Sequence, residues 1–154
     1  MEAARVATRA DVPRLVELAR EAIAELTPTK GGALWARREA RPEPLEPSLA
    51  AAVDDPEQLV LVGTIDETII GYATVRTELL HDGGRLAVID ELYVDPGARG
   101  VGVGEVLMDT VLEWARERSC VGVDSIALPG NRHTKNFFES FGLVARAIVV
   151  HRKL

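Results

Sequence analysis

The chain has 154 residues, of which 47% are hydrophobic and 27% charged, and this composition predicts one soluble globular domain, residues 1–154, with a core that needs no disulfide or metal. The net charge of -6 argues against nucleic-acid partners, which require a basic surface. A single cysteine, no apolar run of membrane-spanning length and no signal-like N-terminus predict a cytoplasmic protein without a membrane partner.

The N-terminal region is predicted to contain a short strand followed by an amphipathic helix. Val6 and Ala7 indicate the strand. Asp11 is a good N-cap, and Pro13 falls in the first helical turn, where its missing N–H costs nothing. Apolar residues then recur at helical spacing as far as Leu26, so this helix is expected to turn one face toward the core.

Residues 27–57 have a different character, with basic residues around Trp35 and prolines at positions 42, 44 and 47. Proline interrupts a continuous helix, so we expect an irregular connection here. A helical turn is predicted at 34–39, and a short helix at 48–53 with Ser48 as its cap.

The remainder of the chain alternates between extended and helical patterns. Strands are predicted at 58–65, 69–79, 85–95, 123–128 and 143–151, and helices at 104–118 and 132–141. The complete order predicts an α/β (α+β) fold, with about four helices around a mixed, mostly antiparallel sheet of six to seven strands.

The most informative segment is the run of arginine and glycines at residues 99–104, RGVGVG, placed between a strand and a helix. Alternate glycines allow tight turns and close approach of a ligand, and the following helix presents free N–H groups, so the run predicts a phosphate site. A Walker loop is excluded because Glu105 and Val106 follow Gly104. Glu105 also breaks the dinucleotide fingerprint. An acyl-CoA pyrophosphate loop, R-x-x-G-x-G, fits Arg99, Gly102 and Gly104.

Residues 89–104, IDELYVDPGARGVGVG, resemble the central motif of the GNAT superfamily of acyl-CoA-dependent N-acetyltransferases. A second motif of that family, N-x-x-A-x-x-x-Y-E-x-x-G-F, is similar to residues 131–143, with Asn131, Glu139 and Gly142 at matching positions. The order of elements agrees as well, so the resemblance covers nearly the whole chain except residues 27–57. That segment varies within the family and shapes the acceptor site.

The resemblance implies a sheet that splays between its fourth and fifth strands, with the pantetheine arm of acetyl-CoA bound to the fourth strand like an added strand. The implied pyrophosphate site is the loop at 99–104. Together these expectations assign CoA binding to Leu92, Tyr93, Val94, Arg99, Gly100, Val101, Gly102, Val103, Gly104, Asn131 and Phe138.

The expected reaction is acetyl transfer to a primary amine by direct attack within a ternary complex, with no metal. A carboxylate can take the proton from the attacking ammonium, and Glu91 and Asp90 are the candidates. They are adjacent in a predicted strand, so only one is expected to face the cleft, and Glu91 is preferred. The backbone N–H of Val94 is the candidate donor to the oxyanion.

Phe138 stands where family members often have a tyrosine that protonates the leaving thiolate. Water, Tyr72 or Tyr93 can take that role, and a non-catalytic acyl-CoA-binding or sensor module remains the alternative. The acceptor is a small-molecule or peptide amine. Basic residues at 37, 38 and 41 favour an acceptor that carries a carboxylate or phosphate. The last predicted strand, at 145–151, offers an edge for a homodimer.

Overall fold

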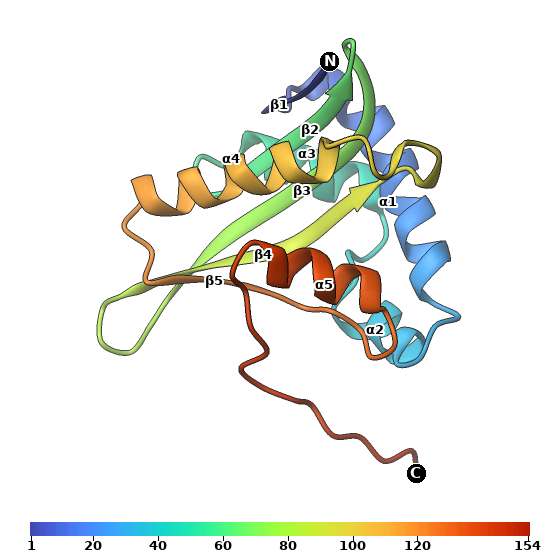
Figure 1. Cartoon of the computed structure of the whole chain (residues 1–154), viewed down its shortest axis with the longest axis vertical. Helices are drawn as coiled ribbons and strands as arrows, with labels where there is room; N and C mark the ends of the chain where they lie inside the picture. Colours follow the sequence, from blue (N-terminus) through green and yellow to red (C-terminus); the bar gives the residue numbers. More distant parts are fainter.

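The computed structural model describes all 154 residues (Figure 1). Its helices are α1 (Val12–Leu26), α2 (Gly32–Arg38), α3 (Leu45–Asp54), α4 (Val103–Glu117) and α5 (Arg132–Ser140). Its strands are β1 (Glu2–Val6), β2 (Leu59–Ile65), β3 (Thr68–Leu79), β4 (Arg85–Val94) and β5 (Gly122–Ser125). Short 3₁₀ turns precede α1 and follow β4, at Arg9–Asp11 and Pro96–Ala98.

The five strands form one mixed sheet in the order β1-β2-β3-β4-β5. Strands β1 to β4 are antiparallel neighbours, and β5 runs parallel to β4. β5 pairs with β4 only between residues 86–89 and 122–125. The C-terminal half of β4 therefore has β3 on one edge and no strand on the other.

Helices cover both faces of this sheet (Figure 1). One face packs against α4 and α5 through a cluster that includes Leu107 and Phe138, and the other packs against α1 and α3 through a cluster that includes Leu15. β2 contributes alternate residues to the two clusters. The apolar run Leu59–Val62 follows from this position, because a strand covered on both faces needs no polar side.

Several predicted elements are confirmed and others are corrected. The helix at Val12–Leu26 and the hairpin of β2 and β3 lie where the sequence indicated. The predicted helix at 48–53 begins earlier, at Leu45, so Ser48 lies inside α3 and does not cap it. The sheet has five strands instead of six to seven, and there are five α-helices instead of about four.

The missing strand is the predicted one at 143–151, which forms no strand in the structure. Its sequence favours extended backbone, but a strand also needs a partner that accepts and donates hydrogen bonds, and this segment has none within the chain. It runs away from the rest of the protein instead (Figure 1). None of the five α-helices has the combination of length and hydropathy needed to cross a membrane.

Candidate active site

The backbone groups of Leu92 and Val94 point away from β3, toward the open edge of β4. The amide of Asp95 donates to the carbonyl of Ile70 on β3 at 2.7 Å. Peptide groups alternate in direction along a strand, so the N–H of Val94 points to the opposite edge, which β5 leaves open. β5 ends at Ser125, so the second half of β4 has an open edge, and the Val94 amide faces it.

The loop from Arg99 to Gly104 joins this edge to the N-terminus of α4. Gly100 and Gly102 have φ values of 87° and 90°, in the left-handed region that glycine adopts without strain. Six consecutive amides, from Gly100 to Glu105, donate no hydrogen bond within the protein. A Cβ at Gly100 would meet no atom within 4 Å, so the loop is open toward its outer side.

These observations fit the group that the sequence implied. A row of free amides at a helix N-terminus, with the positive end of the helix dipole behind it, is suited to phosphate oxygens. The free amide of Val94 precedes the loop by a few residues. An extended ligand could therefore contact β4 along its length and the loop with a pyrophosphate at its end. The residues at 99–104 thus have the properties of a phosphate-binding loop.

The side chain of Arg99 makes its contacts with α1 and β4, not with the outer side of the loop. Its guanidinium makes two hydrogen bonds to the carboxylate of Glu25 on α1, at 2.8 and 2.7 Å, and a third to the carbonyl of Val94 at 2.9 Å. It also lies over the ring of Tyr93, 5.3 Å from the ring centre. The hydrogen bonds from Arg99 lower the pKa of Glu25. Arg99 therefore fixes the loop to α1 and β4.

Asn131 directly precedes α5, and Phe138 lies in the last turn of this helix. The side chain of Asn131 caps α5 by accepting a hydrogen bond from the amide of Thr134 at 3.3 Å. Phe138 is buried in the core cluster that also contains Val94. The neighbouring Phe137 approaches the start of α4, where a Cβ on Gly104 would come within 3.2 Å of its ring.

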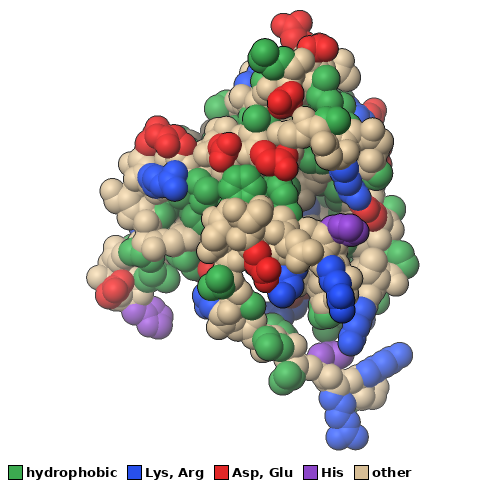
Figure 2. Space-filling model, in the orientation of Figure 1, with side chains coloured by type: hydrophobic (Ala, Val, Ile, Leu, Met, Phe, Trp, Pro, Cys, Tyr) green, Lys and Arg blue, Asp and Glu red, His purple; other side chains and the backbone are tan.

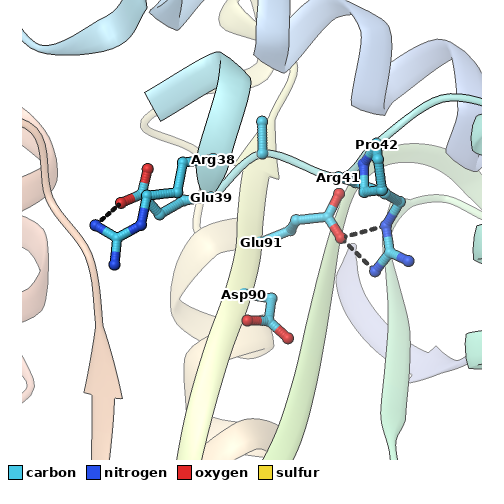
Figure 3. Close-up of a pocket in the computed structure, with 7 residues that line it drawn as sticks. Arg38, Glu39, Arg41, Pro42, Asp90 and Glu91 are labelled. Carbon is cyan, nitrogen blue, oxygen red and sulfur yellow. Dashed lines mark hydrogen bonds and ion pairs between the residues drawn. The ribbon is translucent and has the colours of Figure 1, made fainter. Parts of the chain in front are cut away.

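A cavity of about 230 Å³ lies beside β4, between this strand and the segment that joins α2 to α3 (Figure 3). Its lining residues are Arg38, Glu39, Ala40, Arg41, Pro42, Asp90 and Glu91. Asp90 and Glu91 were expected on opposite faces of the strand, and that expectation is wrong. The pairing of β3 with β4 shifts between Thr74 and Val75, and Asp90 is the extra residue of the resulting bulge. A bulge brings consecutive side chains to one side, so both carboxylates reach the cavity.

Glu91 is held by four donors. Arg41 binds its Oε1 through Nε at 2.8 Å and through Nη2 at 2.6 Å, and Thr74 donates to the same oxygen at 2.9 Å. The hydroxyl of Tyr72 donates to Oε2 at 2.5 Å. Burial, with the adjacent Glu91 carboxylate, raises the pKa of Tyr72 well above its usual value. Both oxygens of the Glu91 carboxylate are therefore engaged by side chains of the protein.

Asp90 has a simpler environment. Its one charged partner is Arg76 on β3, whose Nε lies 3.1 and 3.0 Å from the two carboxylate oxygens. Partial burial raises the pKa of Asp90, and Arg76 opposes this effect without cancelling it. Asp90 is therefore a candidate proton acceptor in this cavity.

The structure also adds residues that sequence reasoning missed. Tyr72 and Thr74 are two residues apart on β3 and are almost fully buried. Buried hydroxyls need hydrogen-bond partners, so two hydroxyl residues on one face of an apolar strand could have indicated a buried polar partner. Of the basic residues 37, 38 and 41, which were expected to favour an acidic acceptor, Arg41 is buried against Glu91, whereas Arg38 is exposed and makes one contact of 3.4 Å with Glu39. The guanidinium of Arg41 is therefore committed to Glu91.

Tyr72 and Tyr93 are the two tyrosines that could supply the hydroxyl absent at Phe138. Tyr72 and Tyr93 both belong to the cluster on the α1 and α3 face, whereas Phe138 belongs to the opposite one. Burial, with Glu25 nearby, raises the pKa of Tyr93 to about 12.

No three side chains of the His, Cys, Asp or Glu type converge on a point where they could hold a metal ion.

Comparisons with known proteins identify the family and the fold. The sequence model of the acetyltransferase (GNAT) family matches residues 18–143. No curated protein gives a significant sequence match.

Solved structures share the fold at low sequence identity. The BH1408 protein from Bacillus halodurans, solved as a tetramutant, is 20% identical, with a TM-score of 0.82 and coverage of 98% of this chain and 99% of the other. The aminoglycoside acetyltransferase meta-AAC0020 from an uncultured soil metagenomic sample is 20% identical, with a TM-score of 0.73 and coverage of 99% and 95%. AAC(6')-Iy, bound to the bisubstrate analogue CoA-S-monomethyl-acetylneamine, is 16% identical, with a TM-score of 0.76 and coverage of 100% and 99%.

Proposed function

Because the chain belongs to the GNAT family of acetyltransferases, we propose that it transfers an acetyl group from acetyl-CoA to a primary amine by direct attack in a ternary complex. The observation that carries this proposal is the row of six unpaired amides from Gly100 to Glu105, directly after the open edge of β4. On this proposal residues 1–154 act as one acyltransferase domain.

The binding roles follow from the contacts already described. The amides of residues 100–105 would receive the pyrophosphate, and the backbone of Leu92 and Val94 would pair with the pantetheine arm. Asn131 would donate its free amide group from the start of α5, and Phe138 would form part of the apolar wall. Arg99 acts from behind the loop, because its contacts with Glu25 and Val94 hold the loop in position.

Acetyl-CoA supplies the acyl group as a thioester, and CoA is released with a free thiol. We assign Asp90 the role of base, since its raised pKa and single cationic partner suit it to take a proton from the attacking ammonium. The N–H of Val94 is the donor available to the reacting carbonyl oxygen. Phe138 offers no hydroxyl, so the departing thiolate takes its proton from water.

We propose the cavity beside β4 as the acceptor site and residues 27–57 as the segment that shapes it. Three carboxylates and two arginines line this cavity, and both arginines are already paired with carboxylates (Figure 3). This charge distribution favours an acceptor that enters as a cation, such as an alkylammonium or an aminoglycoside, which is the substrate class named for one structural neighbour.

Replacing Arg41 with methionine is expected to raise the KM for the amine and to lower stability by about 3 kcal/mol. The change leaves the buried Glu91 carboxylate without its cationic partner and releases the acceptor segment from β4. Arg38→Met is the matched control, because its pair with Glu39 is exposed and contributes at most about 1 kcal/mol. Chemical denaturation and steady-state kinetics measure both effects; equal behaviour of the two variants would remove Arg41 from this role.

Release of free thiol from acetyl-CoA in the presence of a panel of amines tests the proposed activity. We expect release that depends on the amine and saturates with it. A non-catalytic acyl-CoA-binding or sensor module is the second candidate, favoured by the phenylalanine at position 138. Tight CoA binding without thiol release with any amine would support that candidate and exclude the enzymatic one.

A further inference from the structure

A groove of about 400 Å³ lies where the C-terminal half of α4 packs beside the ends of β1 and β2. Its apolar lining residues are Val6 of β1, Leu59 of β2 and Trp114 of α4. Val6 is 63% exposed, so part of this apolar surface is open to solvent. The groove shares no lining residue with the cavity beside β4, and the proposed acetyl transfer gives it no role.

The side of the groove formed by α4 is acidic. Asp109, Glu113 and Glu117 line it, and all three are exposed. Together with Glu105 they occupy every fourth position of the helix, so their carboxylates follow one another along one side of α4. Figure 2 shows acidic side chains in a row over this helix. None of the four forms an ion pair with a cationic group of this chain.

This charge arrangement is unfavourable for the protein alone. Like charges four residues apart on a helix repel one another. Glu117 is also the last residue of α4, where the negative end of the helix dipole disfavours a carboxylate. Cationic side chains placed in the groove would relieve both effects, so the charge pattern favours a basic partner over a neutral or acidic one.

The strand beside the groove has a free edge. β1 is the first strand of the sheet, with β2 as its one neighbour. The amide of Ala7 donates to the carbonyl of Val60 on β2 at 2.9 Å. Peptide groups alternate in direction along a strand, so the N–H groups of Ala4 and Val6 point to the outer edge of β1. An extended segment of another protein can pair with such an edge.

We propose that the groove and the outer edge of β1 bind an extended basic segment of a partner protein. The segment adds to the sheet beside β1 and presents two basic side chains, separated by an apolar one, on the side that faces α4. Basic residues four apart in a strand are separated by about 13 Å. Asp109 and Glu117 are eight residues apart on a helix, which corresponds to about 12 Å. The apolar residue between the basic ones covers Val6 and Trp114. The proposal does not depend on the acetyltransferase activity.

Fluorescence anisotropy with the labelled peptide TKTLTKT tests the proposal on the full chain. We expect saturable binding, and its absence up to about 1 mM peptide would overturn the proposal. The control peptide TTKKLTT has the same composition, but adjacent lysines point to opposite sides of a strand. It should bind at least about fivefold more weakly, because one ion pair is lost. Equal affinity of the two peptides would mean attraction by charge alone and would contradict the proposal.

Replacing Glu113 and Glu117 together with glutamine should weaken the binding of TKTLTKT at least about fivefold. The matched control replaces Glu21 and Glu46 with glutamine. These two glutamates are exposed and form no ion pair, and they lie on α1 and α3, which cover the other face of the sheet. Both double variants change the net charge by two, so an equal loss in both would overturn the proposal.

The Tm of the Glu113→Gln, Glu117→Gln variant separates a binding role from a structural one. The two carboxylates repel each other, so their removal should not lower the Tm. A lower Tm would mean that these carboxylates stabilise the fold, and would contradict the argument that they await a cationic partner.

Hydrogen exchange of the wild-type protein locates the contact without any variant. The amides of Ala4 and Val6 should gain protection when TKTLTKT is added. Protection at Val94 instead would place the peptide at the open edge of β4 and overturn the proposal. Protection of Ala4 and Val6 that rises with protein concentration in the absence of peptide would mean that a second copy occupies this edge, and would overturn it as well.

Discussion

Replacing Gly102 with glutamate is expected to weaken the binding of CoA at least about 100-fold, which corresponds to roughly 2.7 kcal/mol. Gly102 has a φ of 90° and lies within the row of free amides before α4. A side chain here strains the backbone, and its Cβ would lie 3.4 Å from the side chain of Glu2. The new carboxylate also places a negative charge where the helix dipole now favours a phosphate.

Isothermal titration with CoA measures this effect, and Gly83→Glu provides a matched control. Gly83 has nearly the same φ, 89°, and lies in the turn between β3 and β4, where a Cβ would meet no atom within 4 Å. Both variants add one glutamate to a left-handed glycine, so strain and net charge change alike. We expect Gly83→Glu to bind CoA as wild type does. Equal loss in both variants would mean that strain, rather than the phosphate site, accounts for the effect.

The loop was predictable from sequence because its determinants are local. Positive φ at Gly100 and Gly102, the following helix and its free amides all arise within a few residues, and glycine spacing reports them directly. The helix at Val12–Leu26 was accessible for the same reason, since proline near its start and regular apolar spacing define it.

The cavity beside β4 was not predictable in this way because its determinants are long-range. The shared orientation of Asp90 and Glu91 depends on a shift in pairing between β3 and β4, and periodicity within one strand does not reveal such a shift. The partner of Glu91 is Arg41, which lies 50 residues earlier. From sequence Arg41 was one of several basic residues in an irregular segment, and only the fold distinguishes it from Arg38.

The C-terminal segment shows a third kind of limit. Its composition correctly indicates a strand-forming sequence, yet strand formation is decided by whether a partner edge is available. In the single chain this segment has no strand partner, and β5 pairs with β4 on one edge only. The sequence predicts the propensity, and the availability of a partner edge determines the outcome.

Replacing Asp90 with asparagine is expected to lower kcat by about 10²- to 10⁴-fold while the affinity for CoA stays unchanged. The amide keeps the size of the side chain but accepts no proton. Because partial burial raises the pKa of Asp90, its ionised form is lost at a higher pH than that of an ordinary aspartate. Wild-type kcat should therefore fall as the pH drops through this raised pKa. The Asp90→Asn variant should lack that acidic limb in its pH–rate profile.

Two further variants decide whether the effect belongs to Asp90 as a base. Glu78→Gln removes the other carboxylate bound by Arg76, at 2.6 Å, and should leave kcat near that of wild type. Glu91→Gln disturbs the contact with Arg41, so we expect a lower rate with the acidic limb retained. If Glu91→Gln abolishes the limb and Asp90→Asn does not, Glu91 is the base and the assignment to Asp90 fails. The comparison works because the two carboxylates are adjacent in the same cavity and differ mainly in the number of donors that hold them.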